Sequence, residues 1–335
     1  MEILGESQKI TMAHGSGGSA TRMLVEELFQ KNFGNDALDK MEDAAVIDVP
    51  SGKIAYTTDS FVVTPIFFQG GDIGKLSVCG TLNDLLVMGA TPKYLTAGFI
   101  LEEGMDMKDL EEIVKSMAAI ARDTNIKIVA GDTKVIEGKG GIYINTSGLG
   151  FINQKPLHTS NVKPGDAVIL SGTLGNHHAC ILSQRMNIEN TISSDCAYLG
   201  EMVQNLIKEE IEIKTMRDVT RGGLATVLNE IADGSNTTIG LLEENIPVDP
   251  EVKSFCDILG LDPLYMANEG KLVCFVPQED AQKALNIIKN SNYGEKAAIV
   301  GEVIKREDVA VTVTTRIGGK RILKALQGEG LPRIC

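Results

Sequence analysis

Short apolar runs alternate with amphipathic segments along most of the chain, and this alternation predicts strands and helices in turn. Residues 73–88 and 107–125 place apolar side chains three and four positions apart, which is typical of helices. Further predicted helices cover residues 179–186, 199–209, 221–232 and 279–290. Predicted strands lie near residues 44–49, 53–58, 94–100, 126–130, 142–151, 167–171, 238–242, 272–276, 298–304 and 309–315.

The predicted elements fall into two sets, separated near residue 155 by a segment that contains Pro156 and Pro164. We therefore expect a two-domain protein of the α+β class with mixed α/β sheets. The N-terminal domain would span residues 1–155 and the C-terminal α/β domain residues 156–318. The pattern fades after Gly318-Gly319, so residues 319–335 are expected to form a mobile tail.

Composition narrows the class of protein. The chain has 335 residues, of which 43% are hydrophobic, enough for a large core. No apolar run approaches the roughly 18 residues of a membrane span, and no signal peptide precedes the first element, so we expect a cytoplasmic protein. A net charge of −13 and the absence of Trp argue against nucleic acid as a partner.

The six cysteines show no Cys-x-x-Cys pair, which argues against a disulfide framework and a structural zinc site. Five are internal and are expected in the core, whereas Cys335 is the last residue. Residues 328–335, if extended, would reach roughly 25 Å at about 3.3 Å per residue. Cys335 is therefore either a nucleophile carried into a cleft or a frayed end without a role.

Acidic residues stand at the ends of several predicted elements, where side chains from different strands can converge on one cleft. Binding a polyphosphate to so acidic a protein requires cations, and Mg²⁺ accepts carboxylate, water and phosphate oxygens together. The pattern favours a magnesium-nucleotide site over unrelated caps and turns. Asp43, Asp59, Asp132 and Asp218 stand at such ends, and Asp84 lies inside the helix predicted for residues 73–88, beside Asn83.

Two glycine-rich stretches differ in what they predict. Residues 70–76 resemble a P-loop but place Gln69 and Leu76 where that motif needs glycine and a hydroxyl residue, so they are not one. Residues 14–19 are instead compatible with a flap whose backbone N–H groups wrap phosphates, or with an ordinary surface loop around His14. Lys134 and Glu269 are candidate acid/base groups, although either alone could be a solvated charge.

Together these residues resemble a known family, and the matching segments run through the whole chain. The chain resembles the HypE family of hydrogenase maturation proteins, in the superfamily of aminoimidazole ribonucleotide synthetase, selenophosphate synthetase and thiamine-monophosphate kinase. The last four residues, Pro332-Arg-Ile-Cys335, are the ending specific to that family. The other matching segments are Ala13-His-Gly-Ser-Gly-Gly18, Asp43-Ala-Ala-Val46, Thr58-Asp-Ser60, Gly70-Gly-Asp-Ile-Gly-Lys75, Asn83-Asp84, Met88-Gly-Ala90, Ala130-Gly-Asp-Thr-Lys134, Asp218-Val-Thr-Arg-Gly-Gly-Leu224 and Asn268-Glu-Gly-Lys271.

The resemblance implies a homodimer whose N-terminal domains build a β-barrel at the interface, with ATP and Mg²⁺ in the groove between the two domains. It implies ATP-dependent dehydration of a carbamoyl group on the Cys335 thiol to a thiocyanate. A HypF-like carbamoyltransferase would supply the carbamoyl group. The cyano group would pass to iron on a HypC-HypD-like scaffold complex during assembly of the [NiFe]-hydrogenase cofactor.

The resemblance also implies roles for residues of this chain. Cys335, Glu269 and Lys134 would be catalytic, with Glu269 the better base because a lysine is protonated at neutral pH. Asp43, Asp59, Asp84 and Asp218 would hold metal. ATP would be bound by these four acids together with His14, Gly15, Gly17, Gly18, Thr58, Asn83, Asp132, Thr133 and Arg221.

Two alternatives remain open from the sequence. A relative in the same superfamily could phosphorylate a free small molecule, in which case the terminal cysteine would be incidental. A nucleotide-gated binding module could instead dock partners through its acidic surface and tail without any chemistry. Turnover of a free substrate by a chain without its tail would favour the first, and nucleotide-dependent partner binding without hydrolysis the second.

Overall fold

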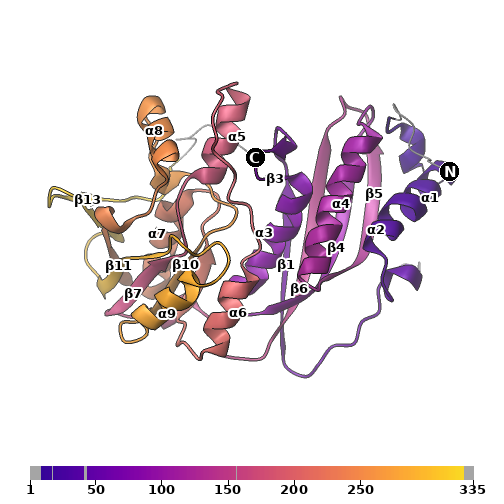
Figure 1. Cartoon of the computed structure of the whole chain (residues 1–335). Coiled ribbons are helices and arrows are strands. Elements are labelled where there is room, and N and C mark those ends of the chain that lie inside the picture. Colours follow the sequence, from indigo (N-terminus) through magenta and orange to yellow (C-terminus); the bar gives the residue numbers. More distant parts are fainter. Residues whose placement is uncertain (1–8, 17, 41–43, 156, 328–335) are drawn as a thin grey trace.

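The N-terminal domain is a four-stranded sheet with helices on one face (Figure 1). The computed structural model describes residues 9–16, 18–40, 44–155 and 157–327. The strand order is β1 (Lys53–Phe61), β6 (Ile142–Ile152), β4 (Thr91–Glu102) and β5 (Lys127–Ile136), in which only β4 and β5 run parallel. Two helices cover it, α3 (Ile73–Val87) and α4 (Met107–Asp123). Because no helix among the described residues covers the other face, β1 alternates exposed and half-buried residues.

The chain before β1 adds a helical region at the β5 side of the sheet (Figure 1). It contains a short 3₁₀ turn, η1 (Met12–Gly15), and then an unbroken helical stretch made of α1 (Ser19–Leu24), the π-helical η2 (Val25–Gln30) and α2 (Lys31–Phe33). The short turn η3 (Leu38–Lys40) follows. A two-stranded ribbon, β2 (Phe67–Phe68) with β3 (Gly71–Asp72), precedes α3.

Helix α3 lies at the centre of the molecule and is buried on nearly every side. It packs on the N-terminal sheet with one face and on elements of the C-terminal domain with another. A helix that is apolar all round is typical of such a position, and α3 has no polar face. Its two adjacent polar residues, Asn83 and Asp84, therefore sit at the boundary between the domains.

The C-terminal domain is a seven-stranded mixed sheet with helices on both faces. The order is β13 (Lys320–Ile322), β12 (Val311–Thr314), β9 (Thr237–Leu242), β11 (Ala298–Lys305), β7 (Asp166–Leu170), β10 (Leu272–Pro277) and β8 (Thr215–Asp218). Helix α7 (Gly223–Ser235) covers one face, and α6 (Gly200–Lys208) with α9 (Ala281–Lys289) the other. Every residue of β7 and β10 is consequently buried.

Helices α5 (Asn176–Arg185) and α8 (Pro250–Leu259) pack together and join their apolar side chains to the core of the N-terminal domain. Short 3₁₀ turns cover residues Thr159–Asn161, Glu243–Asn245 and Pro263–Tyr265. Residues 186–199, called the connecting segment below, run without regular structure from α5 to α6 along the domain boundary. Among the described residues, no helix is both long and apolar enough to cross a bilayer.

Two expectations from the sequence are corrected, and helix α8 was missed. The strand expected at residues 44–49 is not formed, because these residues pair with no strand of the described chain and Val46 is 81% exposed. Helix α8 was not predicted, although Pro250 at its first turn is a typical helix start. The mobile tail was expected to begin at residue 319, but Lys320–Ile322 pair with β12 and Leu323 is fully buried, so the folded domain continues beyond that residue.

Leu323 therefore tests where the folded domain ends. Leu323→Ala is expected to lower the free energy of unfolding by about 2–5 kcal/mol, because it empties a core site under α7. The matched control is Ile322→Ala on the neighbouring residue, whose side chain is 54% exposed. Urea denaturation of both variants measures the difference in the free energy of unfolding. Equal stabilities would show that Leu323 belongs to a mobile tail and not to the core.

Candidate functional site

Four carboxylates from four separate elements approach one another at the domain boundary. Asp59 lies on β1, Asp84 on α3, Asp218 at the end of β8, and Glu269 in the turn before β10. Asp84 accepts a hydrogen bond from the Thr57 hydroxyl at 3.0 Å, which fixes its side chain against β1. We call these four residues the carboxylate group.

The electrostatics of the carboxylate group show that its members interact. Burial, Asp218 and Asp59 together raise the pKa of Asp84 to about 6, partly offset by the Thr57 hydrogen bond. Burial raises the pKa of Asp218 as well. The pKa of Glu269 is raised well above its usual range by burial and then by Asp195, Asp218 and Asp59. Negative charge is thus disfavoured here unless a cation or a proton compensates it.

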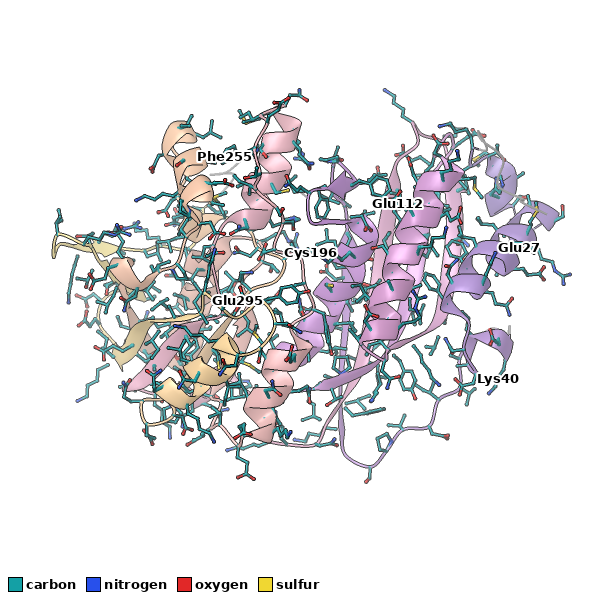
Figure 2. The ribbon with its side chains drawn as sticks, in the orientation of Figure 1. Glu27, Lys40, Glu112, Cys196, Phe255 and Glu295 are labelled. Atoms are coloured by element: carbon teal, nitrogen blue, oxygen red, sulfur yellow. The ribbon has the colours of Figure 1, made fainter. Side chains whose placement is uncertain are left out.

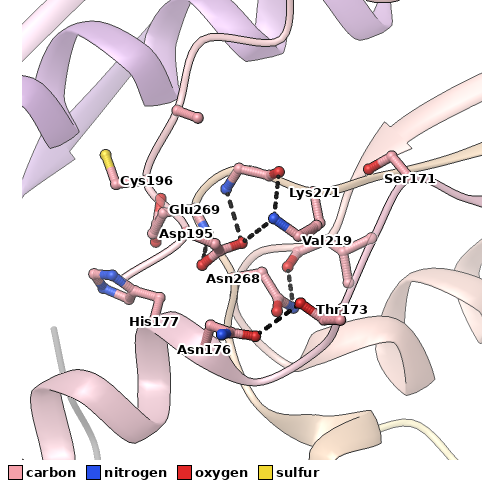
Figure 3. Close-up of polar contacts among 12 residues, drawn as sticks. Ser171, Thr173, Asn176, His177, Asp195, Cys196, Val219, Asn268, Glu269 and Lys271 are labelled. Carbon is pink, nitrogen blue, oxygen red and sulfur yellow. Dashed lines mark hydrogen bonds and ion pairs between the residues drawn. The ribbon is translucent and has the colours of Figure 1, made fainter. Parts of the chain in front are cut away.

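The Glu269 turn is held by its backbone rather than by its carboxylate (Figure 3). Asp195, from the connecting segment, accepts hydrogen bonds from the N–H groups of Glu269 and Gly270, both at 3.2 Å. Its carboxylate also pairs with Lys271 at 3.2 Å. Within the described chain, no side chain hydrogen-bonds or ion-pairs with the Glu269 carboxylate, which leaves that group available for chemistry.

Asn268 ties the same turn to two further loops. Its amide donates to the Val219 carbonyl at 2.9 Å and accepts from the Gly175 N–H at 2.8 Å, and the side chain is fully buried. Val219 directly follows Asp218, so this contact fixes the spacing between Asp218 and Glu269. Arg221, exposed in the turn that precedes α7, lowers the pKa of Glu269 through its positive charge.

A second set of predicted residues gathers at β5. Asp132 and Lys134 form an exposed ion pair at 2.9 Å, which lowers the pKa of Asp132. Turn η1 packs against the same strand: His14 is buried and bonds to Thr11, and a Cβ at Gly15 would come within 2.7 Å of the Val135 backbone. Gly18 caps α1 nearby in sequence, and Thr133 lies between the ion-paired residues.

An apolar cavity of about 160 Å³ opens beside this second set. Phe29 and Phe33 of the N-terminal helical stretch form one wall, and Ala97 and Phe99 of β4 form another. Its β5 side ends at Asp132 and Thr133. The cavity therefore combines aromatic walls with a polar rim, a combination typical of ligand pockets.

The two sets lie at opposite edges of the N-terminal sheet. β1 and β5 are separated by β6 and β4, a distance of about 14 Å at the usual strand spacing. The sequence led us to expect that these residues share one cleft, but within one chain the structure places them in two separate sets. Asp132, Thr133, Lys134, His14 and Gly15 are thus not brought to the carboxylate group by the fold of a single chain.

One predicted residue, Thr58, occupies an unexpected position, and two residues were not predicted. The Thr58 side chain lies on the uncovered face of β1, where the Ser147 hydroxyl donates to its oxygen at 2.9 Å, and not on the Asp84 side. Thr57 was missed, although the two-residue period of a strand places it on the same face as Asp59. Asp195 was also missed, because nothing in its local sequence marks it.

Asn83 joins the domains. Its amide donates to the Ala197 carbonyl at 2.9 Å and accepts from the Leu199 N–H at 3.0 Å, and its side chain is 3% exposed. These bonds use the polar groups that nucleotide binding would need. The contact therefore ties α3 to the connecting segment, whatever else the residue does.

Asn83→Ala is expected to destabilise the protein by about 2–3 kcal/mol, because it leaves a buried N–H and a buried carbonyl unpaired. Asn292→Ala, on an exposed residue of the same type, is the control and should change stability little. Thermal and urea unfolding of the two variants would decide, and an unchanged midpoint in Asn83→Ala would show that water replaces the lost bonds.

The carboxylate group fits Mg²⁺ in the type of its ligands but does not form a cage. In the described parts of the chain, no three acidic, histidine or cysteine side chains stand close enough to hold a metal ion by themselves. Oxygen ligands and mutual repulsion suit a hard cation whose remaining ligands are phosphate oxygens and water. Asp59, Asp84 and Asp218 are the residues that would hold it.

Three predicted site residues, Gly17, Asp43 and Cys335, lie outside the described residues. The other five cysteines are all buried, as expected, and Cys196 lies deep between the two domains (Figure 2). Burial raises the pKa of Cys256 to about 11 and that of Cys274 to about 12, and burial also raises that of Cys180. Thiols of this kind are poor nucleophiles.

Comparison with known proteins places this geometry in a family. The models of the N-terminal and C-terminal domains of AIR synthase related proteins match residues 41–152 and 163–314. Carbamoyl dehydratase HypE of Azotobacter vinelandii is 46% identical over 332 residues, 97% of each chain. A crystal structure of hydrogenase maturation protein HypE in complex with ATP aligns with a TM-score of 0.93 at 45% identity, covering 97% of this chain and 99% of the other.

A second solved structure, of a HypE-HypF complex, aligns with a TM-score of 0.79 at 46% identity over 90% of this chain and 99% of the other. The agreement extends over both domains and both sheets. The mixed α+β fold expected from the sequence is thereby confirmed. The chain belongs to the HypE family of hydrogenase maturation proteins and is an enzyme of the carbamoyl dehydratase kind.

Proposed function

We propose that this protein uses ATP to dehydrate a carbamoyl group carried on the Cys335 thiol, giving a thiocyanate that supplies the cyanide ligands of [NiFe]-hydrogenase iron. The observation that carries the proposal is the Glu269 carboxylate. This carboxylate has no hydrogen-bond or ion-pair partner in the described chain, its pKa is raised, and it lies near Asp218 and Asp59, two acids suited to holding a metal-bound phosphate. A carboxylate whose pKa is raised is a stronger base than an ordinary carboxylate, which suits it to proton removal.

In the proposed reaction the carbamoyl oxygen is phosphorylated first, and the nitrogen then loses its two protons. The carbamoyl oxygen attacks the γ-phosphorus of ATP, and ADP leaves. Loss of one N–H proton then allows the C–O bond to break, so that the oxygen departs as inorganic phosphate. Loss of the second N–H proton leaves S–C≡N. Glu269 is the group we assign to proton removal, because an amide nitrogen becomes acidic only once its oxygen is phosphorylated.

Magnesium, when bound, would neutralise the transferring phosphoryl group and hold it in line. Asp59, Asp84 and Asp218 provide the protein oxygens, with Asp43 as a further candidate. Arg221 is exposed, its charge acts on Glu269, and it would contact phosphate. A metal-free protein is expected to bind nucleotide weakly because phosphate would then meet an uncompensated carboxylate group.

We further propose that the working site is built by two chains. Lys134 and Asp132 belong to β5, at the edge of the sheet opposite β1, and a homodimer in which β5 of one chain approaches β1 of the other would unite the two sets. The uncovered sheet face carries exposed Ile54 and Tyr56, 50% and 68% exposed, as an interface would. The apolar cavity beside Asp132 would then take the adenine ring.

Mixed dimers test this arrangement. Lys134→Ala and Glu269→Gln chains, co-expressed with different tags and purified as the heterodimer, should regain about half of the wild-type turnover, since one of two shared sites is complete. Each homodimer of either variant should be inactive. An inactive heterodimer would show instead that Lys134 and Glu269 act within one chain.

Partners follow from the same proposal. A HypE-HypF complex is known for a relative, and a HypF-like carbamoyltransferase is the donor we expect here. The acceptor would be a HypC-HypD-like scaffold that carries iron. Phosphate has already left when the thiocyanate forms. Only the cyano group is then transferred from Cys335 to the acceptor.

The proposal is tested by the mass of the C-terminal peptide after incubation with a carbamoyl source, Mg²⁺ and ATP. We expect a carbamoyl adduct on Cys335 that loses one water only with hydrolysable ATP. A tail that stays unmodified beside an active carbamoyl donor would overturn the proposal and favour a kinase that acts on a free small molecule.

A further inference from the structure

Asp195 is a buried acid that belongs to no motif identified in the sequence and takes no part in the proposed reaction steps. It lies in the connecting segment, and its side chain is 5% exposed. Figure 3 shows its carboxylate directed at the Glu269 turn, with Lys271 on the same side. The residue comes from a loop that follows α5, whereas the turn precedes β10, so the contact is between segments about 75 positions apart in the chain.

The two carboxylate oxygens of Asp195 have different partners. Oδ1 accepts from the Glu269 N–H, and Oδ2 accepts from the Gly270 N–H and pairs with the Lys271 ammonium, each at 3.2 Å. The Glu269 carbonyl in turn accepts from the Ala197 N–H at 3.4 Å. The peptide groups on both sides of the Glu269 Cα are therefore fixed by the connecting segment.

Steric packing restricts the turn further. A Cβ at Gly270 would come within 1.9 Å of the Asp195 carbonyl oxygen, so the two segments touch along their backbones. The connecting segment is itself braced next to Asp195, since the Ser194 hydroxyl oxygen accepts from the Cys196 N–H and pairs with the His177 ring at 2.8 Å. Neither side of the contact can shift without breaking these bonds.

Lys271 supplies the charge that Asp195 needs. His177 is the other basic side chain close to Asp195. It is neutral near pH 7 because burial lowers its pKa to about 4. Lys271 is 7% exposed and also donates to the Gly270 carbonyl at 3.0 Å. Both members of the pair are thus buried, and both contact the turn that carries Glu269.

We propose that Asp195 is a positioning residue, which fixes the Glu269 and Gly270 peptide groups so that the Glu269 carboxylate points toward Asp59 and Asp218, while Lys271 neutralises its charge. The proposal rests on the proposed role of Glu269 in proton removal. A base displaced by as little as an ångström loses much of its rate, so the effect belongs to kcat and not to nucleotide binding.

Two variants separate positioning from simple stabilisation. Lys271→Met removes the cation but leaves both Asp195 oxygens to accept the two N–H groups. The double variant Asp195→Asn, Lys271→Met buries no charge, yet its amide offers only one oxygen to two donors. If Asp195 and Lys271 only stabilise the fold, the single variant Lys271→Met should lose more stability and activity than the double variant, because it leaves a buried carboxylate unpaired. Positioning predicts the reverse order for turnover.

The test measures kcat and the KM for ATP of the dehydration step in the full-length protein, with carbamoyl loading of Cys335 followed by mass. We expect the double variant to lose on the order of 10- to 100-fold of kcat with KM unchanged, and Lys271→Met, which keeps both accepting oxygens, to lose clearly less. Wild-type kcat in the double variant, or an equal loss in Lys271→Met, would overturn the proposal. Wild-type protein that loads but never dehydrates would instead refute the proposed function.

Discussion

Replacing Cys335 with alanine is expected to abolish thiocyanate formation while ATP affinity stays within about twofold of wild type, because only the atom that carries the substrate is lost. No other cysteine can substitute. The five described cysteines are buried, and burial raises the pKa of Cys180, Cys256 and Cys274. Mass spectrometry of the reaction products and calorimetry with ATP and Mg²⁺ measure the two quantities.

The neighbouring substitution Ile334→Ala is the control, since it alters the same tail but keeps the thiol. It should still yield the carbamoyl adduct and its dehydrated form. Product from Cys335→Ala would contradict a tail-borne substrate, and loss of ATP binding in that variant would show that the cysteine is structural.

Periodic apolar patterns predicted most helices and strands within a few residues, because packing on a sheet or helix needs one apolar face. The long helix over residues 73–88 is α3, observed as Ile73–Val87, and residues 107–125 contain α4, Met107–Asp123. The failures lie where pairing is non-local. Lys320–Ile322 form a strand only because β12 lies beside them, and nothing in the local sequence after Gly319 indicates that.

The sequence named candidate site residues by type, but it did not predict which of them lie together. The sequence singled out Asp59, Asp84 and Asp218, and the charges of these three residues interact in the structure. Asp132 belongs to the opposite edge of the sheet, a consequence of strand order that no motif encodes. Asp195 escaped notice because its role depends on a contact with a turn about 75 residues away.

Glu269→Gln is expected to slow dehydration on the order of 10²- to 10⁴-fold, the usual contribution of a positioned general base. Carbamoyl loading of Cys335 should be unchanged, because that step uses the thiol and the partner enzyme. Single-turnover measurements on preloaded protein isolate dehydration from loading. Glu279→Gln, at an exposed position before α9, is the matched control and should behave as wild type. Unchanged dehydration in Glu269→Gln would remove the residue from the mechanism.

The same substitution should stabilise the fold in the absence of nucleotide and metal. Burial and the acids Asp195, Asp218 and Asp59 raise the folded-state pKa of Glu269 above its unfolded value. The stabilisation that comes from a protonated Glu269 is therefore complete below the unfolded pKa and is lost as the pH rises through the folded pKa.

Glutamine stays neutral throughout, so Glu269→Gln should unfold at a higher temperature than wild type at about pH 8, with the difference shrinking toward about pH 5. Calorimetric melting of both proteins across this range measures it. A residue kept for stability would give the opposite sign, with the variant less stable at every pH. A variant that is more stable yet unable to dehydrate its carbamoyl adduct would show that the buried charge is retained for chemistry and at the expense of stability.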